Sequence, residues 1–105
     1  MAWLFLVVAG LLEIVWAIGL KLSNGFSHLG WSIMTVLGMI ASFYFLAQAL
    51  KVIPVGTGYA IWTGIGAAGT AILGIVLFSE SGTLPRLFCI ALIIAGIVGL
   101  KLTSN

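Results

Sequence analysis

Charged residues are scarce in this sequence. Only 6% of its 105 residues are Asp, Glu, Lys or Arg, whereas 63% are hydrophobic and the mean hydropathy is +1.35. A soluble globular domain carries charge on about a quarter of its residues, so this composition excludes that class. The apolar stretches between the charges reach roughly the 18 or more residues that a membrane span requires. The composition therefore predicts an integral membrane protein.

Cysteine and clustered basic residues are also scarce. The single cysteine, Cys89, lies inside an apolar stretch, so it offers no disulfide within the chain and no set of metal ligands. The four basic residues give a net charge of +2, but they are scattered singly and form no patch for phosphate. We therefore expect no metal, no cofactor and no nucleic-acid partner.

Four apolar segments are separated by short links that contain polar or turn-forming residues. We expect membrane-spanning helices at about 3–20, 31–50, 56–78 and 84–102. Links this short join antiparallel neighbours, and an even number of spans places both termini on one side of the bilayer. The whole chain, 1–105, is predicted to be one all-α transmembrane domain of four helices.

The first and fourth segments have features that need separate interpretation. The first could be a signal peptide, but it lacks a basic start and a small-residue cleavage site and carries Glu13 in its middle, so we predict a span. The fourth has the shortest uncharged stretch. It can still cross the bilayer if Arg86 and Lys101 extend their alkyl stems and place their charges at the two interfaces.

The basic residues give no preferred orientation in the membrane. Lys51 and Lys101 fall on the side of the termini, and Lys21 and Arg86 fall on the other side, whereas cytoplasmic links normally carry the excess of Lys and Arg. A chance tie in a short chain is one explanation. The other is that the protein inserts both ways up, so that two copies can associate antiparallel.

Glu13 is the acidic residue that lies inside a predicted span. An ionised carboxylate near the bilayer midplane costs on the order of several kcal/mol and is rarely retained without a use. No basic residue lies at a matching depth, so the countercharge should come from outside the protein, as a proton or a cationic ligand. The structural alternative is a protonated acid that is hydrogen-bonded between helices. We predict that Glu13 binds substrate and protons.

Two neighbours on the first span share the face of Glu13. Gly10, one turn earlier, leaves room beside the carboxylate. Trp16, one turn later, can direct its indole N–H toward the acid or a neighbouring group, because a buried Trp normally finds a hydrogen-bond partner. An anchoring role at the membrane interface fits Trp16 less well, since it lies several residues inside the span.

The second and third spans add aromatic and hydroxyl groups. Tyr59 and Trp62 are spaced by three residues and present aromatic faces, which attract cations, although such residues also simply fill apolar space. Thr63 lies beside them. Ser42 could bond a neighbouring helix or its own backbone. The predicted lining of the site is Gly10, Trp16, Ser42, Tyr59, Trp62 and Thr63.

Glycines and other small residues predict a hinge and a contact surface. Gly64 and Gly66 follow the aromatic pair closely and weaken the regularity of the third span, which predicts a hinge there. The interior of the fourth span contains no polar residue, so we predict that it forms a dimerisation surface. Small residues that permit close helix contact would form this surface: Ala91, Ala95, Gly96 and Gly99.

These features together resemble those of a known family. Glu13 is followed by Ile-Val-Trp-Ala, the first link contains Asn24-Gly25-Phe26, and residues 54–66 read PVGTGYAIWTGIG. Over essentially the whole chain, this pattern resembles the small multidrug resistance family. Trp16, one turn after Glu13, and Gly-Leu-Lys at the end of the fourth span resemble the guanidinium exporter subtype of that family.

The resemblance implies four helices per subunit and an antiparallel homodimer of dual topology in the lipid of the bacterial inner membrane. It implies a proton-coupled antiporter, not an enzyme, that exports guanidinium by alternating access. It assigns the paired Glu13 carboxylates to proton and substrate binding, and it places Trp16, Ser42, Tyr59 and Trp62 around them. One alternative is a quaternary ammonium exporter on the same scaffold. Another, from a different class, is a structural subunit of a membrane complex, which would not explain Glu13 with its aromatic partners.

Overall fold

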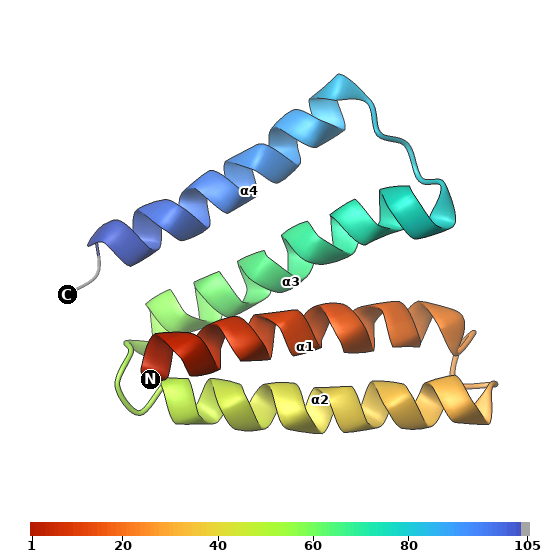
Figure 1. Ribbon diagram of the computed structural model, residues 1–105, viewed down its shortest axis with the longest axis horizontal. Helices are drawn as coiled ribbons and strands as arrows, with labels where there is room; N and C mark the ends of the chain where they lie inside the picture. The colour runs from red at the N-terminus through yellow and green to blue at the C-terminus, as the bar shows by residue number, and fades with distance from the viewer. Residues whose placement is uncertain (104–105) are drawn as a thin grey trace.

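The computed structural model of the protein describes residues 1–103, which form four α-helices (Figure 1). These are α1 (Ala2–Leu22), α2 (Leu29–Ala49), α3 (Val55–Phe78) and α4 (Leu84–Thr103). Each helix has 20 to 24 residues and a mean hydropathy between 1.7 and 2.3, so each is long and apolar enough to cross a membrane. The predicted all-helical architecture with four spans is therefore confirmed, with helix ends close to the predicted ones.

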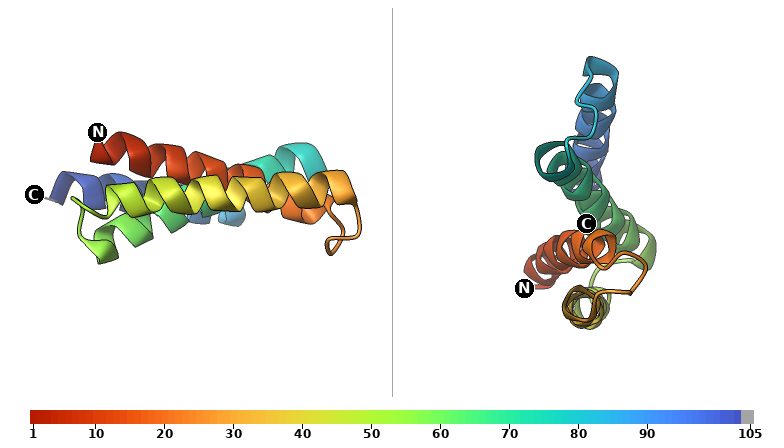
Figure 2. Two further views of the ribbon diagram at one scale, coloured as in Figure 1. Left: turned by 90° about the horizontal axis from the view of Figure 1, so that it is seen from below. Right: turned by 90° about the vertical axis from the view of Figure 1, so that its right-hand side faces the viewer.

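The helix α1 occupies the centre of the bundle. It packs against α2 on one side and α3 on the other, while α4 packs along the outer side of α3. The links reverse the chain each time, so α1 and α3 run in one direction and α2 and α4 in the other (Figure 1). Seen from the end of the bundle, α4 stands apart from the group formed by the other three helices (Figure 2). Only α1, α2 and α3 surround a common interior.

Residues with unusual backbone angles close the links. In the first link, Asn24, Gly25 and Phe26 have φ values of 50°, 71° and 66°, which Asn and Gly adopt at low cost. The fully buried Ser23 fixes this turn, because its hydroxyl donates to the Leu20 carbonyl at 2.7 Å and accepts the Phe26 N–H at 3.1 Å. This turn holds α1 and α2 as antiparallel neighbours.

Small residues let the three inner helices approach closely. A Cβ at Gly38 of α2 would lie 3.0 Å from the Trp16 Cβ of α1, and one at Gly10 of α1 would lie 2.7 Å from the Ile65 Cβ of α3. By contrast, Ile90 is the only buried residue of α4, at 8% exposure. The interior of one subunit is thus built by α1, α2 and α3, and most side chains of α4 point outward.

Candidate functional site

Glu13 lies in the middle of α1 and faces α3. Its carboxylate sits against Gly66, and a Cβ added at Gly66 would overlap with it. The Oε1 atom is buried and has no hydrogen-bond partner among residues 1–103. The ion pair that these residues form is between Glu80 in the last link and Arg86 in the first turn of α4, at 3.7 Å, so no basic side chain compensates Glu13. A buried carboxylate oxygen without a partner is costly, which makes this position a candidate binding site for a proton or a cation.

The hydroxyl of Ser42 joins all three inner helices, one turn before Glu13 on α1. It donates to the Ala9 carbonyl of α1 at 2.7 Å and accepts the Nε1–H of Trp62 of α3 at 3.0 Å. Ser42 is fully buried and Trp62 is 6% exposed. Of the two partners considered for Ser42, the neighbouring helix is therefore the one observed. Because its N–H is already used, Trp62 is held in place and has no hydrogen bond left to donate to a ligand.

Aromatic rings form a chain that runs from α3 through α2 to α1. The rings pack edge-to-face in sequence. The distance between ring centroids is 5.2 Å for Tyr59 and Trp62, 5.7 Å for Trp62 and Phe43, and 6.4 Å for Phe43 and Trp16. Such tilted contacts are favourable arrangements of the ring quadrupoles. Phe43 was not predicted from the sequence, where it is one of many apolar residues in a span. Its place directly after Ser42 was the only available signal.

Trp16 and Thr70 carry the two other buried polar atoms that lack a partner within residues 1–103. Trp16 packs its Cβ against Gly38, and its Nε1–H has no acceptor. The predicted hydrogen bond of this indole is therefore absent in this structure. Thr70 of α3, whose Oγ1 is likewise unpaired, was also missed in the sequence, although it lies one helical turn after Gly66.

The remaining predicted residues of the site serve packing or lie exposed. Gly10 faces Ile65, so a side chain of α3 occupies the space beside it. Thr63 is exposed, one turn after Tyr59. Gly64 faces Ile97 of α4, and α3 continues as a regular helix through Gly64 and Gly66. The proposed hinge therefore involves residues that are helical in this structure.

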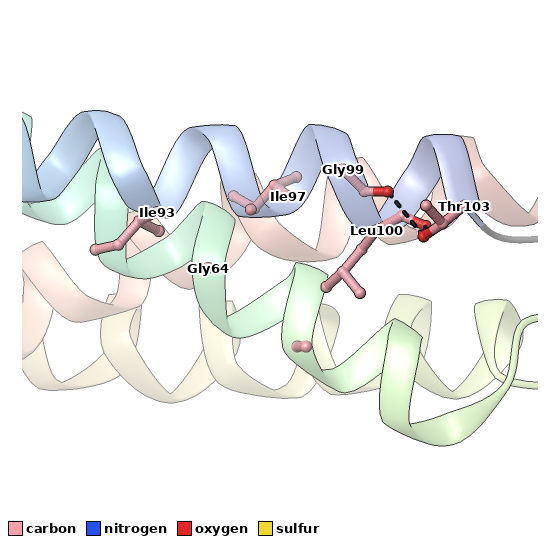
Figure 3. Close-up of a pocket in the computed structure, with 8 residues that line it drawn as sticks. Gly64, Ile93, Ile97, Gly99, Leu100 and Thr103 are labelled. Carbon is pink, nitrogen blue, oxygen red and sulfur yellow. Dashed lines mark hydrogen bonds between the residues drawn. The ribbon is translucent and has the colours of Figure 1, made fainter.

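The predicted dimerisation residues lie on α4, away from Glu13. Ala91 and Ala95 are exposed, and a Cβ at Gly96 or Gly99 would meet no other atom within 4 Å. An open groove of about 540 Å³ runs between α3 and α4 beside them (Figure 3). Its lining is apolar apart from Thr103, whose hydroxyl donates to the Gly99 carbonyl at 2.8 Å. This groove therefore offers no group that would recognise a charged ligand.

Comparison with known proteins identifies the class. The family model described as Small Multidrug Resistance protein matches residues 1–93. The guanidinium exporter of Yersinia pseudotuberculosis is 62% identical over 104 residues, which cover 99% of this chain and 100% of the relative. The guanidinium exporters of Escherichia coli K12 and Salmonella typhimurium LT2 are 58% and 55% identical over 105 residues, the full length of both chains in each case.

The chain therefore belongs to the small multidrug resistance family, as its residues indicated. Membership in this family and four apolar spanning helices together make it a multi-pass protein of the bacterial inner membrane.

Proposed function

We propose that this protein exports guanidinium and small substituted guanidinium cations from the bacterial cell in exchange for protons. The observation that carries the proposal is the carboxylate of Glu13, which faces Gly66, has a buried and unpaired Oε1, and has no basic partner among residues 1–103. Relatives that are 55 to 62% identical over their full length are named guanidinium exporters, which supports the same cargo. The proposed activity is transport, not catalysis.

The chemistry of guanidinium fits the groups gathered around Glu13. The cation is planar and donates pairs of N–H groups, so a carboxylate can accept two parallel hydrogen bonds from it. Its flat, weakly hydrated faces stack on aromatic rings. The ring of Tyr59, which is 56% exposed, provides such a surface, and Trp62, fixed by Ser42, supports it through an edge-to-face contact. Cation and protons then compete for the same carboxylate.

Competition at one site gives coupled exchange if the site opens alternately to the two sides of the membrane. Protons that enter down their gradient displace the cation on one side, and the protonated site returns to bind the next cation. The change in access requires a movable segment. We assign this role to Gly64 and Gly66 of α3, where the absence of side chains permits helix bending.

We further propose an antiparallel homodimer, in which the two Glu13 carboxylates contribute to one transport pathway. Three features support it: α4 buries one residue within its own subunit, it carries Ala91, Ala95, Gly96 and Gly99 on its surface, and basic residues are balanced between the two sides of the membrane. Two inverted copies would present the same site to both sides of the membrane.

Flux measurements on the purified protein in liposomes test the proposed exchange. Under an imposed pH gradient, we expect guanidinium to move against protons, and an outward guanidinium gradient to drive protons inward. Tetraethylammonium, which has no N–H to donate, should drive much less proton movement. Absence of proton movement with guanidinium would overturn the proposal, and equal rates for the two cations would favour a quaternary ammonium exporter.

The dimer is tested by fixing the orientation. Two or three Lys residues added near Ser27 and Gly82, in the two links on one side, should lock the protein one way up and abolish transport. Co-expression with a copy biased the other way by Lys residues near Val52 and at the termini should restore transport. Normal transport by one locked copy alone would contradict the antiparallel dimer.

A further inference from the structure

The hydroxyl of Thr70 is buried and has no hydrogen-bond partner among residues 1–103, so it differs from three hydroxyls that bond to the backbone of their own helix. Ser32, Thr35 and Thr103 each donate to the carbonyl four residues earlier, at 2.7 to 2.8 Å. Thr70 could bond the Gly66 carbonyl in the same way, but it does not, and its Oγ1 has no partner among residues 1–103. In this structure the hydroxyl of Thr70 is therefore available for a hydrogen bond to a ligand.

The position of Thr70 connects it with the candidate site. Residues 59, 63, 66 and 70 are spaced by four, three and four, so Tyr59, Thr63, Gly66 and Thr70 share one face of α3. Gly66 lies against the Glu13 carboxylate. Tyr59, which is 56% exposed, and Thr63 come before Gly66 along this face, and Thr70 comes one turn after it. A stripe of hydroxyl groups thus runs along α3 past the acid.

We propose that Thr70 is a further substrate-binding residue, whose hydroxyl oxygen accepts an N–H of guanidinium while Glu13 holds the cation. This proposal rests on the proposed function. Guanidinium carries more N–H donors than one carboxylate can accept, so its remaining donors need acceptors within the site. Ser42 is a poor candidate, because its hydroxyl already donates to Ala9 and accepts from Trp62. Thr70 has free lone pairs on the same face as Gly66.

This contact would contribute to selectivity. A site with a buried acceptor favours a ligand that brings a donor and disfavours one that leaves the acceptor unpaired. Guanidinium and alkylguanidinium ions bring N–H groups, whereas quaternary ammonium ions bring none. Thr70 should therefore favour the first class over the second, in addition to the preference that the charge of Glu13 provides for any cation.

Thr70→Val tests the proposal, because valine keeps the shape of threonine and removes the hydroxyl. With the purified full-length protein at a pH where Glu13 is ionised, we expect Thr70→Val to weaken guanidinium binding about tenfold. Tetraethylammonium binding should be unchanged. Thr70→Ser, which keeps the hydroxyl, should bind guanidinium like the original protein. Thr35→Val is the matched control, because its buried hydroxyl is bonded to Trp31, and guanidinium affinity should be unaffected.

Thermal unfolding separates a binding role from a structural one. Removing an unpaired buried hydroxyl should leave the melting temperature unchanged or raise it. Equal guanidinium affinity in Thr70→Val and the original protein would overturn the role of Thr70 and leave the proposed function intact. A lower melting temperature in Thr70→Val would show that the hydroxyl has a structural partner, for example in a second copy, and would also overturn it. Failure of the original protein to bind guanidinium would overturn the proposed function itself.

Discussion

The inner helices α1, α2 and α3 differ from α4 in what they bury, although all four are similarly apolar. The inner three share the hydrogen bonds of Ser42 with Ala9 and Trp62, and they carry the three buried side-chain polar atoms that lack a partner among residues 1–103. The helix α4 buries only Ile90. Hydropathy alone does not separate the two regions, because every helix averages between 1.7 and 2.3. Buried polar groups do, and they support the proposed binding role of the inner helices and the proposed association through α4.

The two acidic residues provide the largest expected contrast. Glu13→Gln keeps the size of the side chain but removes its charge and its titration, so it should abolish cation binding and coupled proton movement. Glu80→Gln is the matched control, since Glu80 lies in the exposed link after α3, paired with Arg86 at 45% exposure of each side chain. It should retain transport and cost less than about 1 kcal/mol of stability. Transport assays on both variants check this, and full transport by Glu13→Gln would contradict the role of the acid.

A methyl group in the site should have the next largest effect. In Gly66→Ala, the added Cβ would overlap the Glu13 carboxylate and displace it, and a misplacement of about 1 Å can cost about 100-fold in function. Gly56→Ala on the same helix meets no atom within 4 Å and should transport normally. The measurement is the initial rate of guanidinium transport by each variant. Equal rates would show that the close approach of α3 to Glu13 is not required.

The Ser42 hydroxyl should affect stability more than chemistry. Ser42→Ala leaves the buried Trp62 N–H and the Ala9 carbonyl without their partner, at an expected cost of about 1–3 kcal/mol. Ser32→Ala removes a hydroxyl bonded only to its own helix, at the His28 carbonyl, and should cost less than about 0.5 kcal/mol. Thermal or denaturant unfolding in detergent distinguishes them. Equal losses would mean that the contact across three helices contributes no more than a local one.

A substitution on α4 should have the smallest effect on the stability of one subunit. Ala95→Leu enlarges an exposed residue of α4 and should change subunit stability by less than about 0.5 kcal/mol, while it weakens the self-association that we propose. Ala47→Leu, the same change at an exposed residue of α2, should leave association unchanged. Sedimentation in detergent measures the oligomeric state. An unchanged dimer in Ala95→Leu would remove this part of α4 from the proposed interface.

The sequence predicted the four spans, and an acid inside one of them without a basic partner, because both depend on local composition and on the cost of burying charge. It did not predict which groups would pair. Ser42 could equally have bonded its own helix, and only the packing of α1 against α2 places the Ala9 carbonyl within 2.7 Å. Phe43 and Thr70 were missed for a related reason, since the ring contacts of Phe43 and the burial of the Thr70 hydroxyl depend on how the helices pack. Spacing along one helix cannot reveal that.

The proposed exchange requires guanidinium and protons to compete for Glu13, and calorimetry of guanidinium binding in buffers of different ionisation enthalpy measures this competition. Protonation removes the charge that attracts the cation, so affinity should fall as the pH drops through the pKa of Glu13, by about tenfold per pH unit for each competing proton. At constant pH near that pKa, binding should release protons, and the measured heat should therefore depend on the buffer. Affinity that is independent of pH, with the same heat in every buffer, would contradict the account.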